Sequence, residues 1–205
     1  MSIKFYIITL GLVAMTSLLS YQTMFDQNAK RRFMFNAYAI RHRGEWWRFF
    51  SHGVLHADWT HLLFNMLSLF MFGRIVEPWM VLEFYPYGHF LYLFFYITAI
   101  AASSVWDYFQ QKDNMHYNSL GASGAISAIM FAAALLEPNA RVFYGIPLWI
   151  FGIVYLIYST VLSRMGRDNI GHSAHFWGGI YGLVFTAVIA FHLIAEFTLK
   201  IKGGY

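Results

Sequence analysis

The chain has 205 residues, of which 59% are hydrophobic and only 12% are charged. A soluble domain carries about 25% charged residues. The net charge of +4 could suggest nucleic-acid binding, but no basic stripe interleaved with aromatic residues is present. The cations lie beside long apolar runs, where anionic lipid headgroups are the simpler partner. The composition excludes a soluble domain and predicts a membrane protein; because cysteine is absent, it also excludes a thiolate metal site or a cysteine nucleophile.

A helix needs about 20 mostly apolar residues to cross a bilayer. Six apolar segments predict an all-α fold, a polytopic membrane bundle of six transmembrane helices: Phe5–Tyr21, His61–Val76, His89–Trp106, Leu120–Leu136, Val142–Ser163 and His175–Phe197. We expect the first segment to be a retained helix and not a cleaved signal peptide, because no clear small-x-small cleavage site follows it. No repeat or linker divides the chain, so we expect a single membrane domain over residues 1–205.

Between the first two spans lies a long polar segment, Gln22–Thr60, which contains paired tryptophans beside charge. It is either a segment that lies in the headgroup layer or an ordinary amphipathic surface loop, and the sequence does not decide between them. The fourth span begins with a run of small residues, Gly121–Ala128. Small side chains let helices approach closely, so we expect a short central helix with a water-filled pit above its N-terminus.

Three polar groups stand at the starts of spans. They are His56-x4-His61-x3-Asn65 at the second span, Gly121-Ala122-Ser123-Gly124 at the fourth, and His172-Ser173-Ala174-His175 at the sixth. Because successive spans alternate in direction, these three helices begin on the same side of the membrane. Polar residues inside a membrane usually face a cavity or one another. The spacing therefore predicts one site in one leaflet.

The residue types at this site favour acyl transfer by a serine. Ser123 lies between Gly121 and Gly124, which leave its oxygen open, and the free N–H groups of a helix N-terminus can stabilise an oxyanion. A serine hydroxyl needs a base within hydrogen-bonding reach, and His175 is the candidate. Gly179, one turn beyond it, would let the sixth helix press against the fourth.

His61 and Asn65, one turn apart on one helix face, can offer further donors to the oxyanion. Each of these residues also has an ordinary structural interpretation. A serine in a small-residue helix often bonds to its own helix, a histidine at an interface is often solvated, and an asparagine can tie two helices together. The functional interpretation depends on finding all of these residues together at the same depth in the membrane.

The combined pattern resembles the rhomboid family of intramembrane serine proteases. The matching motifs are Trp46-Trp47-Arg48, His56-x4-His61-x3-Asn65, Gly121-x-Ser123-Gly124 and Ala174-His175-x3-Gly179, within a core of residues 45–184. The first span matches only in position and length.

The resemblance implies that Ser123 is the nucleophile and His175 the general base, as a dyad without a carboxylate, a metal or a cofactor. It also implies an oxyanion hole of His61, Asn65 and the Ser123 N–H. The remaining motif residues would support the site structurally: Gly121, Gly124, Gly179, His56, Trp47, Arg48 and Glu77, the last by tying down the inner end of the second helix. The implied partners are the lipid bilayer and single-span membrane proteins, cut near the outer end of their transmembrane helix. We expect a multi-pass protein of a bacterial inner membrane whose site opens to the extracytoplasmic side.

Two features depart from the family pattern. Many relatives place an aromatic residue four positions after the nucleophile, where it stacks on the histidine; here that position is Ser127. The second departure is the charge distribution, because the implied cytoplasmic side carries five Lys and Arg residues and the other side carries nine. Those nine are Lys30, Arg31, Arg32, Arg41, Arg43, Arg48, Lys112, Arg164 and Arg167. A positive-inside count thus favours the reverse orientation, but we follow the resemblance.

Three other functions are alternatives to a serine protease. A membrane metalloenzyme could use the His172-x2-His175 pair, but a His-Glu-x-x-His run is absent and the serine would stay unexplained. An inactive relative that binds membrane-protein clients remains the alternative, because Ser127 departs from the pattern. A transporter or channel would carry more charged residues deep within its spans. No aspartate is well placed for a triad, since Asp107, Asp113 and Asp168 lie in or near loops.

Overall fold

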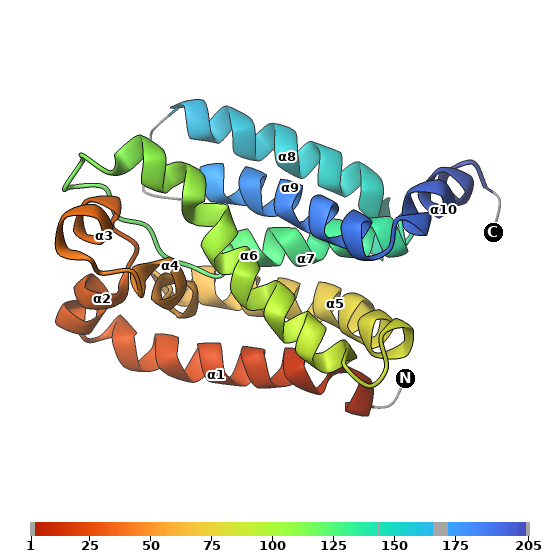
Figure 1. Ribbon diagram of the computed structural model, residues 1–205, viewed down its shortest axis with the longest axis horizontal. Coiled ribbons are helices and arrows are strands. Elements are labelled where there is room, and N and C mark those ends of the chain that lie inside the picture. The colour runs from red at the N-terminus through yellow and green to blue at the C-terminus, as the bar shows by residue number, and fades with distance from the viewer. Residues whose placement is uncertain (1–2, 143, 166–171, 204–205) are drawn as a thin grey trace.

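The computed structural model describes residues 3–142, 144–165 and 172–203 (Figure 1). This part of the chain is mainly helical, with one short β-hairpin and an isolated β-bridge between Phe35 and Ser119. The longer helices are α1 (Ile7–Met24, preceded by a 3₁₀ turn at Ile3–Tyr6), α5 (Trp59–Glu83), α6 (Gly88–Gln111), α7 (Ser123–Leu136), α8 (Leu148–Met165), α9 (His172–Ile189) and α10 (His192–Ile201).

Helix α7 lies at the centre of the bundle, as the small-residue run predicted. Every residue from Gly124 to Leu136 is buried, and Figure 1 shows α7 between α9 on one side and α5 on the other. The α7–α9 approach is close because Gly178 and Gly182 carry no side chain: a Cβ on either would lie 2.1 Å from a carbonyl oxygen of α7. The two helices therefore pack without a side chain between them at these positions, and the small residues set their separation.

Three described helices, α1, α5 and α6, are long and apolar enough to cross a membrane, and α9 with α10 makes a fourth if the bent pair counts as one span. The protein is therefore an all-α membrane protein. Helix α7, with 14 residues, rises only about 21 Å at 1.5 Å per residue, which is less than the roughly 30 Å of a hydrocarbon core.

The predicted boundaries of the last two spans were wrong. The fifth helix begins at Leu148 and not at Val142, because β1 (Arg141–Val142) and β2 (Ile146–Pro147) form a hairpin first. The sixth predicted span does not continue to Phe197: α9 ends at Ile189, and α10 leaves it at an angle of 113°. Helix α10 docks on the C-terminal end of α7, where Lys200 Nζ donates to the Leu136 carbonyl at 2.8 Å.

The long polar segment folds into α2 (Gln27–Phe33), α3 (Ala37–Arg43), α4 (Arg48–Ser51) and a 3₁₀ turn at His52–Val54. The Asp26 and Asn36 side chains cap α2 and α3 at their N-termini. A small apolar cluster holds these helices against α6; its members are Phe35, Ala37, Ile40, Phe49, Tyr108 and Tyr117. The segment is thus packed against the bundle, with Trp46 and Trp47 exposed on its surface.

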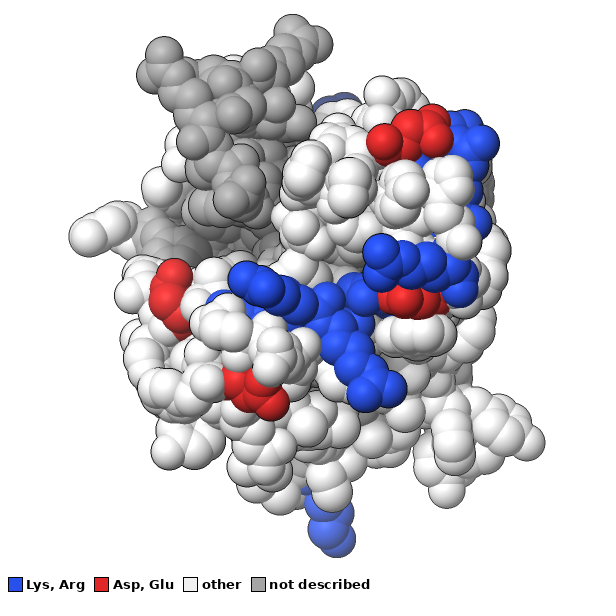
Figure 2. All heavy atoms as spheres, turned by 90° about the vertical axis from the view of Figure 1, so that its left-hand side faces the viewer, with Lys and Arg blue, Asp and Glu red and all other residues white. Residues whose placement is uncertain are grey.

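Basic residues gather across the end of the molecule formed by these short helices, as Figure 2 shows. Several of them are bonded to the protein itself. Lys30 Nζ donates to the Ala57 carbonyl at 2.9 Å, and Arg41 pairs with Asp113 at 2.6 Å. The cations of this segment are therefore not all free charges of a mobile loop.

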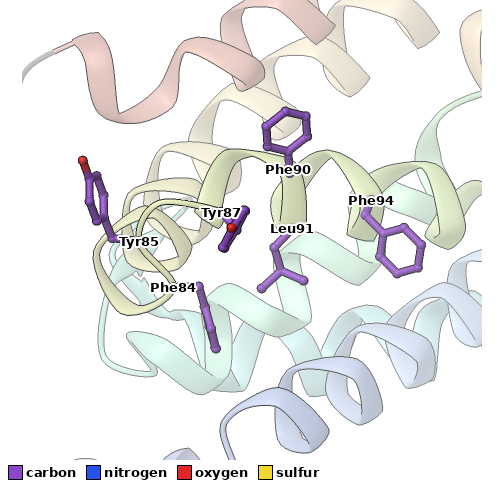
Figure 3. A pocket seen from close by; sticks show the side chains of 6 residues that line it. All are labelled: Phe84, Tyr85, Tyr87, Phe90, Leu91 and Phe94. Carbon is purple, nitrogen blue, oxygen red and sulfur yellow. The ribbon is translucent and has the colours of Figure 1, made fainter.

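The opposite end of the bundle carries an aromatic rim at the turn between α5 and α6. A shallow hollow of about 510 Å³ is lined there by Phe84, Tyr85, Tyr87, Phe90, Leu91 and Phe94 (Figure 3). None of the candidate site residues lines it. Tyr side chains are enriched at membrane–water interfaces, so the exposed Tyr85 and Tyr87 indicate that this end of the bundle lies at such an interface.

Candidate active site

The N-terminus of α7 is shaped by the residue before its cap. Gly121 has a φ of +123°, a conformation that residues with a Cβ rarely adopt. Its N–H donates to the His52 carbonyl at 3.0 Å, which ties this turn to the polar segment. A Cβ at Gly121 would lie 3.0 Å from His61 Nε2 and 3.7 Å from Ser123 Oγ. Gly121 therefore leaves open a small space that the edge of His61 and the Ser123 hydroxyl share.

Ser123 and His175 meet directly. Ser123 is the first residue of α7, His175 lies in the first turn of α9, and the Ser123 Oγ to His175 Nε2 distance is 2.7 Å. This is within the range in which an imidazole accepts a proton from a hydroxyl. Figure 1 shows that α5, α7 and α9 begin at the same end of the bundle.

His61 and Asn65 stand on the first two turns of α5. The Asp58 carboxylate caps this helix by accepting from the His61 N–H at 2.8 Å. His61 Nδ1 faces the Ala57 N–H at 3.4 Å and so acts as an acceptor, which leaves the proton of the neutral ring on Nε2. Asn65 Nδ2 donates one hydrogen to the His61 carbonyl at 2.8 Å and carries a second. Both side chains can therefore act as donors toward an oxyanion.

These four residues line one cavity of about 770 Å³. Its lining comes from α5, α7, α8, α9 and the loop before α5: Ala57, Asp58, Thr60, His61, Phe64, Asn65, Ser68, Ser123, Ile126, Tyr155, Tyr158, Ser159 and His175. Phe64 on α5 and Tyr158 on α8 are more than half exposed. The cavity thus reaches the side of the bundle between α5 and α8.

An aromatic residue that the sequence did not single out packs on His175. Tyr155 of α8 stacks on the imidazole with ring centroids 5.7 Å apart and an interplanar angle of 28°. Its hydroxyl lies 2.8 Å from Ser127 Oγ, four residues after Ser123. No local motif marks Tyr155; only its place within an apolar helix could have pointed to it.

Asp107 lies near the start of α9 but is occupied by other partners. Its carboxylate accepts a hydrogen bond from the Tyr117 hydroxyl at 2.9 Å and a short one from the Ser173 hydroxyl. Asp107 therefore holds the first turn of α9 in place. Asp113 pairs with Arg41 at the surface, and Asp168 lies outside the described residues.

The other motif residues lie around the site. His56 is buried beside His61, its Nδ1 is 2.8 Å from Ser20 Oγ, and burial lowers its pKa to about 3, so this imidazole is neutral. Trp47 is exposed just before α4, whereas Arg48 is buried, pairs with Glu45 and donates to two backbone carbonyls of the polar segment.

Glu77 lies far from Ser123, at the other end of α5. It is fully buried and accepts hydrogen bonds from the Ile8 and Thr9 N–H groups, the Thr9 hydroxyl and His89 Nδ1 at 2.7–2.9 Å. These bonds join α5 to α1 and α6. The carboxylate is thus a structural tie between three helices.

The two motif glycines that flank the dyad make room for side chains. A Cβ at Gly124 would meet Ser103 of α6 at 2.3 Å, and one at Gly179 would meet the Phe131 ring of α7 at 2.8 Å. Gly179 therefore receives an α7 side chain, while the backbone approach of α9 to α7 is made by Gly178 and Gly182. No cluster of three or more His, Asp or Glu side chains suited to a metal occurs within residues 3–142, 144–165 and 172–203, and the His172 side chain of the suggested metal pair lies outside that description.

Comparison with known proteins identifies a family and several relatives to which this chain is similar. The family model for the Rhomboid domain matches residues 43–191. Rhomboid protease AarA of Providencia stuartii is 27% identical over 180 residues, covering 78% of this chain and 60% of the relative. Rhomboid protease GluP of Bacillus subtilis is 33% identical over 145 residues, covering 68% of this chain and 26% of that protein. Rhomboid protease GlpG of Haemophilus influenzae is 27% identical over 184 residues, covering 86% of this chain and 88% of that protein. The chain thus spans less than two thirds of the first two of these relatives.

Proposed function

Because the chain belongs to the rhomboid family, we propose that it is an intramembrane serine endopeptidase that hydrolyses peptide bonds in or near the transmembrane segments of membrane proteins. The observation that carries this proposal is the 2.7 Å contact between Ser123 Oγ and His175 Nε2, at the wall of a cavity that also contains His61 and Asn65. A nucleophile, a base and oxyanion donors at one place are the parts that acyl transfer requires.

In the first step, Ser123 Oγ attacks the carbonyl carbon of the substrate peptide while His175 Nε2 takes its proton. The negative charge moves to the carbonyl oxygen, where the Ser123 N–H, His61 Nε2–H and Asn65 Nδ2–H donate hydrogen bonds. The imidazolium then gives its proton to the leaving amine, the C–N bond breaks, and an acyl ester on Ser123 remains. Water, deprotonated by His175, cleaves this ester and restores the hydroxyl.

The substrates we propose are single-span membrane proteins, and the chain's own partners are such substrates and the lipid bilayer. The cavity reaches the side of the bundle between Phe64 of α5 and Tyr158 of α8, where a neighbouring helix would unwind to present an extended peptide bond. Neither a metal nor a cofactor takes part in the proposed chemistry.

For the architecture we propose one domain of six membrane helices over residues 1–205, with α7 as the short central helix. In a bacterial inner membrane the cavity would open to the extracytoplasmic side. The chain has no cysteine, so Gln27→Cys and Lys202→Cys, both at exposed positions near opposite ends, can report the orientation. An impermeant maleimide should label Gln27→Cys in intact spheroplasts and Lys202→Cys only after permeabilisation; the reverse pattern contradicts the proposed orientation.

The activity is tested with purified protein in liposomes and a tagged single-span substrate. Wild type, Ser123→Ala and His175→Ala are compared, each with and without a chelator. We expect cleavage near the membrane boundary of the substrate, its loss in both variants and no effect of the chelator. Cleavage that persists in Ser123→Ala would refute the dyad, chelator sensitivity would favour a metalloenzyme, and an inert wild type over several substrates would favour a client-binding relative without activity.

A further inference from the structure

The imidazole of His175 is held by a ring that comes from a different helix from the nucleophile. Tyr155 of α8 stacks on His175 at 5.7 Å and 28°, within the 4.5–7 Å range typical of stacked aromatic pairs. We propose that Tyr155 is the positioning residue for the general base and that Ser127 anchors it. This inference rests on the proposed function, since it assigns Tyr155 a role in that reaction.

The direction of the anchoring hydrogen bonds follows from the donors available. The Ser127 hydroxyl has one hydrogen, which it donates to the Ser123 carbonyl at 2.8 Å. Its oxygen is then the acceptor for the Tyr155 hydroxyl, 2.8 Å away. Ser127, buried on the same helix as the nucleophile, thus fixes the far end of the Tyr155 ring while the ring face contacts His175.

A second aromatic residue supports this ring from behind. Phe151, one turn earlier on α8, stacks on Tyr155 with centroids 6.3 Å apart and an interplanar angle of 27°. Phe151, Tyr155 and His175 therefore form a column. The column limits rotation of the imidazole about its side-chain bonds, so that Nε2 stays directed at Ser123 Oγ.

Placing the ring on α8 has a consequence for the cavity. Tyr158 and Ser159 of the same helix line the cavity that contains Ser123. The helix that borders the substrate space therefore also orients the base, and a shift of α8 away from α7 would remove the ring from His175. Alignment of the dyad and the position of α8 are linked through Tyr155.

The decisive variants separate the ring from its anchor. Tyr155→Leu removes the ring, and a base displaced by about 1 Å can lower the rate about 100-fold; we expect that loss in kcat to exceed the change in KM that follows from removing a side chain that lines the cavity. Tyr155→Phe removes the hydrogen bond between Tyr155 and Ser127 and should lower kcat by about fivefold. Ser127→Ala removes this bond together with the Ser127 bond to the Ser123 carbonyl, so it should lower kcat by at least as much. The double variant should be no slower than Ser127→Ala alone, because the bond that Tyr155→Phe breaks is already absent.

A swap tests whether the ring itself matters. Ser127→Tyr combined with Tyr155→Ser conserves total volume and moves the ring to α7, and we expect it to recover kcat to within about tenfold of wild type. The matched control is Tyr181→Leu on α9, because Tyr181 also stacks on a ring, Phe95, and bonds a hydroxyl, Thr98 Oγ1 at 2.6 Å. This control should lower thermal stability without lowering the kcat of the folded protein.

An independent readout does not require activity. The ring current of Tyr155 should shift the NMR signals of the His175 ring protons upfield in wild type; Tyr155→Leu should abolish this shift and the swap should restore it. The inference is overturned if the Tyr155→Leu protein is folded and either keeps the wild-type kcat or keeps the upfield shift of the His175 signals. An inert wild type that still shows the Tyr155-dependent shift leaves the stacking in place and overturns the proposed protease function instead.

Discussion

Replacement of Gly178 by alanine should separate α7 from α9 and pull the dyad apart. A Cβ at Gly178 would lie 2.1 Å from the Gly124 carbonyl oxygen, whereas ordinary contact begins at 3.4 Å. The helices would have to move apart by the difference, about 1.3 Å, because backbone cannot turn aside as a side chain can. Carried to the dyad, this movement would lengthen the 2.7 Å contact of Ser123 and His175 to about 4 Å, beyond hydrogen-bonding distance.

We therefore expect Gly178→Ala to lower kcat about 100-fold and to cost about 2 kcal/mol of stability. The assays are cleavage of a single-span substrate in liposomes and thermal unfolding in detergent. Gly11→Ala is the control, since Gly11 is a helical glycine of α1 with nothing within 4 Å of the added Cβ; it should leave kcat unchanged. Full activity and unchanged melting of Gly178→Ala would refute the reasoning that this backbone contact sets the dyad geometry.

Three further changes have defined outcomes. Gly121→Ala puts a Cβ at a φ of +123° and 2.9 Å from His61 Cε1, so it should lower kcat about 100-fold in the cleavage assay; a fully active variant would show that this turn can relax. Glu77→Ala leaves the buried Thr9 donors and the partly exposed His89 without an acceptor and should cost about 3–5 kcal/mol in thermal unfolding, with Glu77→Gln milder; equal stability of both variants to wild type would contradict the tie. Burial lowers the pKa of His52 from 6.5 to about 4. Between these values the unfolded chain binds a proton that the folded chain does not, so stability present above pH 6.5 should fall by about 3 kcal/mol as pH drops to 4. His52→Asn should flatten this dependence, measured as melting temperature against pH, and an unchanged slope would show that His52 is not its source.

The sequence was sufficient to predict that the three polar groups lie at the same end of the bundle, because this depends only on the direction in which each span runs. Helices α5, α7 and α9 are separated by single intervening helices, so each starts at the same end whatever the exact boundaries are. His61, Ser123 and His175 accordingly line one cavity. An error of several residues in a span boundary does not change the end of the bundle at which each helix begins.

The bend after α9 could not be predicted because nothing local causes it. Residues from Ile189 to His192 include neither proline nor glycine, and their hydropathy continues that of the helix. The bend follows from distant partners: Lys200 Nζ donates to the Leu136 carbonyl at the end of α7, and Asn139 donates to the Lys200 carbonyl. Carbonyls at a helix C-terminus lack intrahelical donors, so docking of α10 satisfies a group that a straight helix would leave unpaired.

The role of Tyr155 was hidden for a related reason. Its partners Ser127 and His175 lie 28 and 20 residues away in the sequence, at spacings set by loop lengths and not by a helical period. The sequence did show that Ser127, four residues after Ser123, departs from the family pattern, and this left open what holds His175. What holds His175 becomes visible only from the packing of α8 on α7 and α9, because this packing places the Tyr155 ring of α8 against Ser127 of α7 and His175 of α9.

The polar segment between α1 and α5 supports the site through a continuous set of contacts. Arg48, buried in this segment, donates to the Met34 carbonyl at 2.7 Å, and so fixes the chain just before Phe35. Phe35 pairs with Ser119 through two backbone hydrogen bonds of 2.9 and 3.2 Å, two residues before the turn at Gly121. Removing one partner of a buried ion pair is strongly destabilising, because it leaves the other charge buried without compensation. Arg48 is thus connected through Met34, Phe35 and Ser119 to the segment that leads into α7.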